Sequence, residues 1–265
     1  MRRKLSKTAL IDIGKFIAVM VAIAVALYQG SEKLGYNWQW YRIPQYLWQF
    51  TEDGFQWGQL MIGLGVTLEI ASISLVLMFV IGLTTALLRM SGSWAGRFVA
   101  RVYMEFIRNS PLLIQLFFLY FVVGPIFGIS GFLAAVIALS LFEGAYASEI
   151  FRAGITSIDK GQWEAARSLG MRPYAMYRYI ILPQAVRRIL PPLTNQSVSL
   201  VKDSALVSTV AILDLTQQGR MIDAVTFLTF EIWFTVAAVY LVVTLTLSAA
   251  ARALERRANG LSPQP

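Results

Sequence analysis

The 265-residue sequence contains neither cysteine nor histidine, and only 14% of its residues are charged. The two missing residue types exclude disulfide bonds, zinc sites of the Cys/His type and catalysis by a cysteine or histidine side chain. The sequence also lacks a G-x-x-x-x-G-K-[ST] phosphate-binding loop, so we do not expect the chain to hydrolyse ATP by itself. We therefore expect no catalytic residue, no metal site and no cofactor in this chain.

The sequence is instead rich in apolar residues, which make up 57% of it and raise its mean hydropathy to +0.59. A soluble domain would have about a quarter charged residues, and one membrane-spanning helix needs about 20 apolar residues. The sequence therefore predicts an all-α, polytopic membrane protein with about six transmembrane helices. The expected spans are residues 10–28, 60–88, 106–123, 132–151, 189–213 and 232–251.

The first of these spans has two interpretations, because the basic segment MRRKLSK precedes it, as in a signal peptide. Its apolar stretch is rather long for a signal peptide, and no A-x-A cleavage site closes it, since Tyr28-Gln29-Gly30 follows. We expect the span to be retained.

The basic residues predict the orientation of the spans. With a cytoplasmic N-terminus, eighteen lysines and arginines fall in predicted inside segments and three, Lys33, Arg42 and Arg220, in outside segments. This asymmetry is the positive-inside pattern, and it places both termini in the cytoplasm. It also accounts for the net charge of +8 without nucleic acid, because the basic residues face anionic lipid headgroups and a cytoplasmic partner.

Residues 36–50, YNWQWYRIPQYLWQF, contain seven aromatic residues in fifteen. Tryptophan and tyrosine prefer the membrane–water interface, because their rings are apolar and their polar atoms require water. We expect an interfacial helix or loop on the outer leaflet, broken near Pro44. A ligand-contacting lid has no specific support.

The fourth span combines small residues with carboxylates. Ser140, Gly144 and Ser148 recur every four residues, which allows close approach of another helix. Glu149 and Arg152 are three residues apart and can form an interfacial ion pair. Glu143 is costly inside a bilayer unless it faces a cavity or a partner. Two interpretations of Glu143 stay open: it lines the transport pathway, or it makes a structural hydrogen bond.

The fifth span is the most polar. It opens with Pro191-Pro192 and carries the polar residues Asn195 and Gln196 before it reaches Lys202 and Asp203, beyond the middle of the bilayer. Such residues are tolerated where they are buried in protein or line a water-filled route. We favour a pathway-lining helix over a kink stabilised by a self-compensating Lys202–Asp203 pair.

The polar segment between the fourth and fifth spans predicts two short helices. Asp159 and Gln162 resemble a capping box that begins a helix near Gly161. Gly170 can end that helix in the left-handed conformation, and Pro173 suits the first turn of a second helix, which Leu182-Pro183 ends or bends. From Glu164 to Pro183 the spacing is E-A-A, three residues, Gly, nine residues, Ile, one residue, Leu-Pro. This spacing resembles the EAA loop by which the membrane subunit of a bacterial ABC importer docks on its ATPase.

Further segments extend this resemblance over residues 58–257, which are similar to permease subunits of polar amino-acid ABC importers of the histidine, glutamine and glutamate/aspartate type. The matching segments are GVTLEI at 65–70, FIRNSPLLIQLFFLYF at 106–121, SLFEGAYASEIFRAGITSIDKGQWEAARSLGM at 140–171, ILPQAVRRILPPLTNQSVSLVKDSALVS at 181–208 and FEIWFTVAAVYL at 230–241. RNSPLLIQ and KDSALVS are the most specific of them. Family members usually have five spans and an outside N-terminus, so the span at 10–28 is an addition.

The resemblance implies a type I importer of the bacterial cytoplasmic (inner) membrane. The implied partners are an ABC ATPase that holds ATP and Mg, a periplasmic or lipid-anchored amino-acid-binding protein, and a second permease copy or a paralogous permease. Residues that match the docking motif are Glu164, Ala165, Ala166 and Gly170. Candidate pathway-lining residues are Glu143, Asn195, Lys202 and Asp203.

The implied organisation has four parts. Residues 1–30 form a cytoplasmic N-terminus with an extra span, and 31–58 an interfacial or periplasmic segment. Residues 59–257 form the importer domain, with a coupling loop at 157–183, and 258–265 a cytoplasmic tail. The expected substrate is a polar or charged L-amino acid, with acidic or amide types somewhat favoured. Which amino acid it is, and whether two like or unlike permeases pair, stays open.

Two other classes of function fit the sequence less well. Gly128-Ile129-Ser130-Gly131 has the look of an intramembrane serine protease site, but a histidine base is missing from the sequence. A secondary amino-acid transporter that works without an ATPase is the main alternative. Inverted repeats would favour it, and none is evident. It would also leave the docking loop without a role.

Overall fold

The computed structural model describes residues 14–22, 25, 29–30, 35–52 and 54–260, and it divides the chain into two units, residues 1–41 and 42–265. In the first unit, residues 14–22 are helical, and the rings of Trp38 and Trp40 stack with centroids 6.0 Å apart. The first expected span, 10–28, lies partly outside the described residues.

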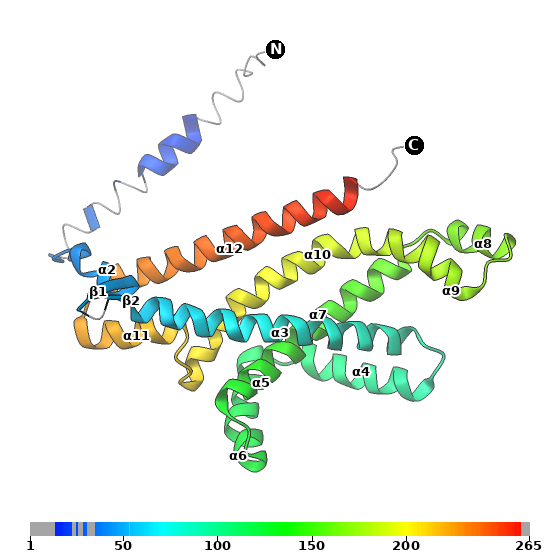
Figure 1. Cartoon of the computed structure of the whole chain (residues 1–265), viewed down its shortest axis with the longest axis horizontal. Helices are drawn as coiled ribbons and strands as arrows, with labels where there is room; N and C mark the ends of the chain where they lie inside the picture. Colours follow the sequence, from blue (N-terminus) through cyan, green and yellow to red (C-terminus); the bar gives the residue numbers. More distant parts are fainter. Residues whose placement is uncertain (1–13, 23–24, 26–28, 31–34, 53, 261–265) are drawn as a thin grey trace. The chain divides into compact units, whose positions relative to one another are not determined.

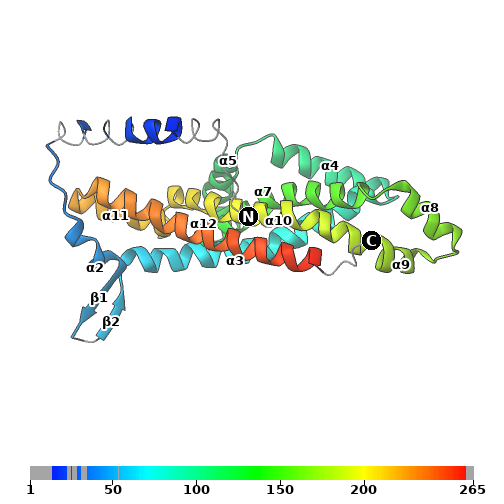
Figure 2. The ribbon, with the colours of Figure 1, turned by 90° about the horizontal axis from the view of Figure 1, so that it is seen from above.

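The second unit is built on four long helices, α3 (Gln59–Met90), α7 (Gly131–Thr156), α10 (Leu182–Asp203) and α12 (Thr229–Gly260). Helix α3 packs along α7, and α10 packs against both α7 and α12 (Figures 1 and 2). Among the described residues, α3, α7 and the 229–257 part of α12 are long and apolar enough to cross a membrane. The expected spans 60–88, 132–151 and 232–251 lie within these three helices.

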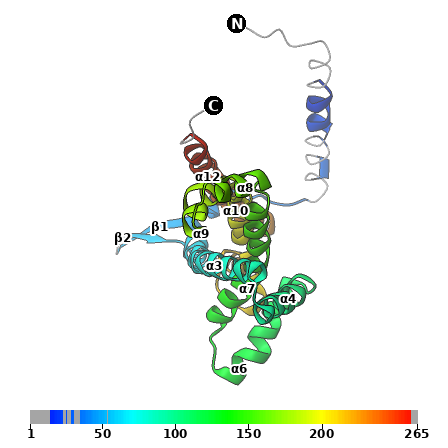
Figure 3. The same ribbon diagram turned by 90° about the vertical axis from the view of Figure 1, so that its right-hand side faces the viewer.

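The third expected span, 106–123, is wrong in its boundaries. Helix α4 (Trp94–Arg108) ends within it, and α5 (Leu112–Phe117) continues at an angle of 105° through a π-helical turn, η2 (Phe118–Val123), into α6 (Gly124–Phe127). Pro111 explains the break, because the residue before a proline is disfavoured in helical conformation and proline has no N–H to donate. Figure 3 shows α6 projecting away from the four long helices.

The fifth expected span begins earlier than predicted. Helix α9 (Pro173–Met176) runs through a π-helical turn, η3 (Tyr177–Ile181), directly into α10, so Pro183 neither ends the helix nor separates the two. In this wide turn the N–H of Leu182 donates to the carbonyl of Tyr177. Such a turn interrupts the regular α-helical hydrogen bonding, so the helix can continue although Pro183 has no N–H to donate. Pro191 and Pro192 lie inside α10, which a 3-10 helix, η4 (Ser204–Val210), follows.

The expected interfacial helix or loop contains an unpredicted β-hairpin. After η1 (Trp40–Arg42) and α2 (Pro44–Leu47), the strands β1 (Trp48–Thr51) and β2 (Gly54–Trp57) pair antiparallel. Trp48 pairs with Trp57 and Phe50 with Phe55, which places all four aromatic side chains on one face. Pro44 begins α2 rather than breaking a longer helix. Within the second unit, the hairpin and α11 (Leu215–Thr226) lie at the end opposite α8 (Lys160–Ser168) and α9.

The contact between α3 and α7 depends on small residues, as the sequence predicts. A Cβ atom added at Gly144 would lie 2.8 Å from Ile81 Cγ2, and one added at Gly82 would lie 2.6 Å from Ala147 Cβ. Ser140 and Ser148, the other two members of the predicted ladder, are buried. Side chains at these glycines would therefore force the two helices apart.

Candidate functional site

The predicted coupling segment forms a capped helix and a tight turn. Asp159 is the N-cap of α8, where its side chain accepts a hydrogen bond of 2.7 Å from the N–H of Gly161. The side chain of Gln162 accepts from Gln184 instead of completing the predicted capping box. At the other end, Gly170 has a φ of +67°.

This end is a Schellman turn, because the N–H groups of Gly170 and Met171 donate to the carbonyls of Arg167 and Ala166 at 2.9 and 3.1 Å. Glycine suits the turn because other L-residues resist the left-handed conformation.

The α8 helix has one anchored face and one exposed face. Ala166 is buried, and the ring of Trp163 packs edge-on against Tyr177 with centroids 5.4 Å apart. Glu164 and Ala165 are exposed, as is Gly170. The anchored face belongs to a hydrophobic cluster that reaches α7 and α10 and includes Met176, Ile181, Phe151 and Ile189. A force on the exposed face would therefore be transmitted to two of the long helices.

Apolar side chains extend this exposed surface. Leu169 is 81% exposed and Tyr174 79% exposed, on either side of the Gly170 turn. Apolar groups gathered on an exposed protrusion mark a surface that contacts another protein or a membrane.

The polar residues of α10 divide between two faces. Asn195 and Lys202 are exposed and lie seven residues apart, so they share one face of the helix. Gln196 and Asp203 show the same spacing on the neighbouring face and are partly buried. Both members of the expected Lys202–Asp203 pair are described, and no ion pair joins them. The self-compensating pair is therefore wrong for this structure.

Glu143 is completely buried between α7 and α10. Its Oε2 atom accepts a hydrogen bond from Nε2 of Gln196, and its Oε1 atom has no hydrogen-bond partner in the described part of the chain. The structure thus brings Glu143 to the helix face that Gln196 and Asp203 share, whereas Asn195 and Lys202 lie on the neighbouring, exposed face.

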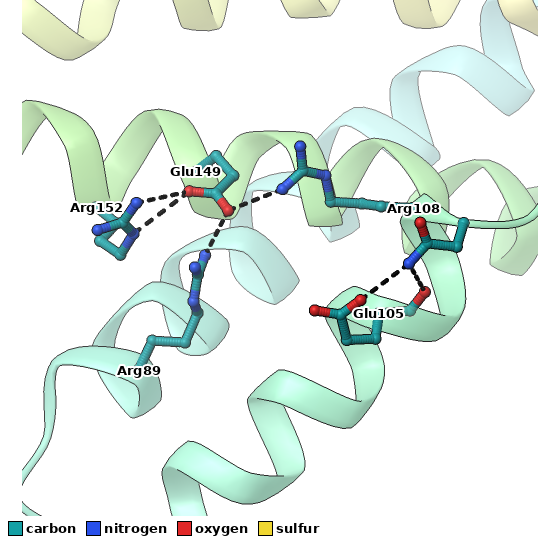
Figure 4. A network of polar contacts seen from close by, with 6 residues as sticks. Arg89, Glu105, Arg108, Glu149 and Arg152 are labelled. Atoms are coloured by element: carbon teal, nitrogen blue, oxygen red, sulfur yellow. Dashed lines mark hydrogen bonds and ion pairs between the residues drawn. The ribbon is translucent and has the colours of Figure 1, made fainter.

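Glu149 lies two turns further along α7 and is the centre of an arginine cluster (Figure 4). Arg89 and Arg108 reach its Oε1 atom at 3.0 and 2.9 Å, and Arg152 reaches Oε2 at 3.1 Å. The predicted pair with Arg152 is confirmed. Arg89 comes from α3 and Arg108 from α4, so their participation depends on the packing of three helices, and sequence reasoning missed both.

In the sequence, Gln196 stands out only as a polar residue of the fifth span. Its seven-residue spacing from Asp203 is the signal that could have placed both on the helix face that meets Glu143. Arg89 and Arg108 carry no comparable signal, because 60 and 41 residues separate them from Glu149.

Comparisons with known proteins agree with the helical membrane core. A profile of the family described as "Binding-protein-dependent transport system inner membrane component" matches residues 78–260. The glutamine transport system permease protein GlnP of Escherichia coli K12 is 42% identical over 201 residues, covering 75% of this chain and 92% of that protein. The probable glutamine ABC transporter permease protein GlnM of Bacillus subtilis 168 is 40% identical over 199 residues, covering 74% and 92%.

Among solved structures, a crystal structure of an amino acid ABC transporter with histidines superposes with a TM-score of 0.70 at 42% identity. The match covers 75% of this chain and 94% of that one.

These matches define the class as the membrane component of an ABC importer. The chain belongs to the family of inner membrane components of binding-protein-dependent transport systems. It is a multi-pass protein of the inner membrane, and the predicted resemblance to amino-acid ABC permeases is confirmed. This membership does not favour a secondary transporter. Ser130, the serine of the protease-like tetrapeptide, caps α7 by accepting a hydrogen bond from the N–H of Leu133.

Proposed function

We propose that this chain is the permease subunit of an ATP-driven importer whose partner ATPase docks on the coupling loop, residues 157–183. The observation that carries the proposal is the exposed surface formed by Glu164, Ala165, Gly170, Leu169 and Tyr174. It combines two features of a docking site: apolar side chains free of intramolecular packing, and a rigid connection, through Ala166 and Met176, to the core of the membrane domain.

The proposed substrate is a polar or charged L-amino acid, with acidic or amide types somewhat favoured, delivered by a periplasmic or lipid-anchored binding protein. Support comes from two relatives named for glutamine and from a similar solved transporter described with histidines. ATP and Mg would be held by the ATPase, because this sequence has no phosphate-binding loop.

The exposed face of α10 is the proposed wall of the transport pathway. Asn195 and Lys202 would be costly against lipid tails, so we place them toward a second permease copy or a paralogous permease, with water between the two. On the neighbouring face, the Glu143–Gln196 hydrogen bond holds α10 to α7. Movement of the coupling loop would then tilt α7 and α10 together, which is the rigid-body motion that alternating access requires.

Substitutions at Gly170 test the coupling role in the complex assembled with its ATPase and binding protein. Gly170→Val should reduce uptake and substrate-stimulated ATP hydrolysis at least tenfold, because a left-handed conformation costs an L-residue about 1–2 kcal/mol and valine is branched at Cβ. Gly170→Asn is the matched control, since asparagine tolerates this conformation, and it should keep most of both activities.

Both variants should insert into the membrane normally, because a Cβ atom at position 170 meets no atom within 4 Å. Full substrate stimulation of the Gly170→Val complex would refute the coupling role.

A further inference from the structure

An arginine-rich cavity of about 590 Å³ lies between α3, α4 and α7. The residues on its wall are Arg89, Arg97, Arg101, Arg108, Arg152, Glu105, Glu149, Met104, Asn109 and Tyr146. Five arginines face two carboxylates, so the wall carries an excess of three positive charges. This excess lies apart from the coupling loop and from the polar face of α10.

Within the described part of the chain, two of these five arginines have no acidic partner. Glu149 is occupied by Arg89, Arg108 and Arg152. Of the other two, Arg97 donates to the carbonyl of Ser91 at 2.9 Å, and Arg101 makes no ion pair or hydrogen bond within the described part of the chain.

Glu105, the second carboxylate of the wall, forms no ion pair with Arg97 or Arg101 among the described residues. Glu105 accepts a hydrogen bond of 2.9 Å from Asn109. Arg97 and Arg101 are four residues apart on α4, a spacing at which like charges destabilise a helix. An anion between them would remove that cost.

An exposed apolar face beside the basic face of α4 indicates where this anion comes from. Phe98, Val102 and Phe106 are exposed along it. The ring of Phe98 stacks on that of Trp94, which lies next to the arginines, with centroids 5.5 Å apart. A helix with one aromatic, apolar face and one basic face lies in the membrane interface, with its basic face among the lipid headgroups. The three arginines of α4 and Arg89 of α3 also belong to the segment that the charge asymmetry places on the cytoplasmic side.

We propose that this cavity binds a phosphate group, and that the group is the headgroup phosphate of an anionic phospholipid of the inner leaflet. Arg97 and Arg101 would contact the phosphate oxygens, because a guanidinium presents paired N–H donors that match them. Glu149 would hold Arg89, Arg108 and Arg152 in place as a positively charged floor. Basic pockets between membrane helices bind acidic headgroups in this way.

Native mass spectrometry of the purified full-length chain, titrated with phosphatidylglycerol or phosphatidylcholine, tests the proposal. We expect the unmodified chain to bind phosphatidylglycerol at least about tenfold more tightly than phosphatidylcholine. The Arg97→Gln/Arg101→Gln variant should lose this preference. The control variant Arg252→Gln/Arg256→Gln removes two exposed arginines from the end of α12, outside the cavity, and should retain it.

Inorganic phosphate is the second probe and separates a lipid headgroup from a soluble anion. Phosphate that raises the melting temperature of the unmodified chain but not of Arg97→Gln/Arg101→Gln, without any lipid preference, would overturn the lipid assignment. Equal lipid binding by all three proteins and no effect of phosphate would overturn the site itself. If the double variant unfolds, Arg101→Gln alone gives the test, because Arg101 is exposed and has no partner to lose among the described residues.

Discussion

At the scale of single residues, two carboxylates six positions apart on α7 have different roles because their burial and their partners differ. Glu143 is buried and accepts a hydrogen bond from Gln196, an uncharged donor. Glu149 is partly exposed and holds three arginines. A buried polar group is stable only when it is hydrogen-bonded, so the first pair supports helix packing and the second supports the junction of α3, α4 and α7.

The hydrogen bond of Glu143 can be tested by a double-mutant cycle. Glu143→Leu should lower the free energy of unfolding by about 1–3 kcal/mol, because the partly buried Gln196 amide loses its acceptor. Glu143→Gln keeps an acceptor and should have a smaller effect. Melting temperatures in detergent measure both. The double variant Glu143→Leu/Gln196→Leu should recover part of the loss, and strict additivity of the two single effects would contradict a direct interaction.

Asp214 provides a pH-dependent prediction. It is the N-cap of α11, with Oδ1 accepting from the N–H of Gln217 at 2.9 Å, and burial raises the pKa of its carboxyl from 3.8 to about 6. The folded chain therefore binds this proton more tightly than the unfolded chain does. The contribution of this group to the stability of the folded chain is therefore greatest below about pH 4, and it is lost as the pH rises through 6.

We expect the melting temperature to drop between pH 5 and pH 7.5 in the unmodified chain and to drop less in Asp214→Asn. Asparagine can still cap the helix, but it does not ionise. An identical pH dependence in the two proteins would show that Asp214 is not the group responsible.

At the scale of elements, the packing of α3 on α7 requires glycine at one position and not at another. A Cβ at Gly82 would lie 2.6 Å from Ala147 Cβ and 3.1 Å from the backbone oxygen of Gly144, whereas one at Gly65, also on α3, would meet nothing within 4 Å. Gly82→Ala should therefore destabilise the chain by about 1–3 kcal/mol through overpacking.

Gly65→Ala is the control and should be neutral or stabilising, because alanine favours a helix over glycine by about 1 kcal/mol. Chemical denaturation in detergent compares the two variants. Equal stability of both would show that the helices can separate at little cost.

The elements differ in how well the sequence predicted them. The apolar run at 132–151 predicted α7 well, because its length and hydrophobicity suffice to identify it. The sequence did not predict the helix break at Pro111 or the helix continuity through Pro183. Both sites contain a proline, but only Pro183 directly follows a π-helical turn, which allows the helix to continue. The hairpin was missed despite a signal in the sequence, the alternation of Trp48 with Phe50 and of Phe55 with Trp57, which is typical of strands.

At the scale of the whole molecule, the absence of cysteine makes a direct test of orientation available. Gln49 in the hairpin and Leu169 in the coupling loop are both exposed and lie at opposite ends of the second unit. With a cytoplasmic N-terminus, Gln49→Cys should react with a membrane-impermeant maleimide in intact spheroplasts, and Leu169→Cys only after lysis. The reverse labelling pattern would invert the topology that the basic residues predict.

The sequence predicted those parts of the candidate site whose residues are close to one another along the chain. The turn at Gly170 and the cap at Asp159 involve residues within a few positions of each other, so their hydrogen bonds follow from residue type and spacing. The surroundings of Glu143 and Glu149 come from helices that meet only after folding. The sequence left the role of Glu143 open between pathway and structure, and its burial against Gln196 supports the structural interpretation.

The sequence by itself determined the class of this protein. Apolar runs, the asymmetry of basic residues and the spacing of the EAA segment are linear properties, and each follows from how single residues partition between water, interface and lipid. Only the tertiary structure decided which charges meet. Glu149 gathers three arginines, and Arg101 is left facing a cavity, because α3, α4 and α7 pack closely at small residues. Such encounters depend on helix rotation and bending that no one-dimensional pattern specifies.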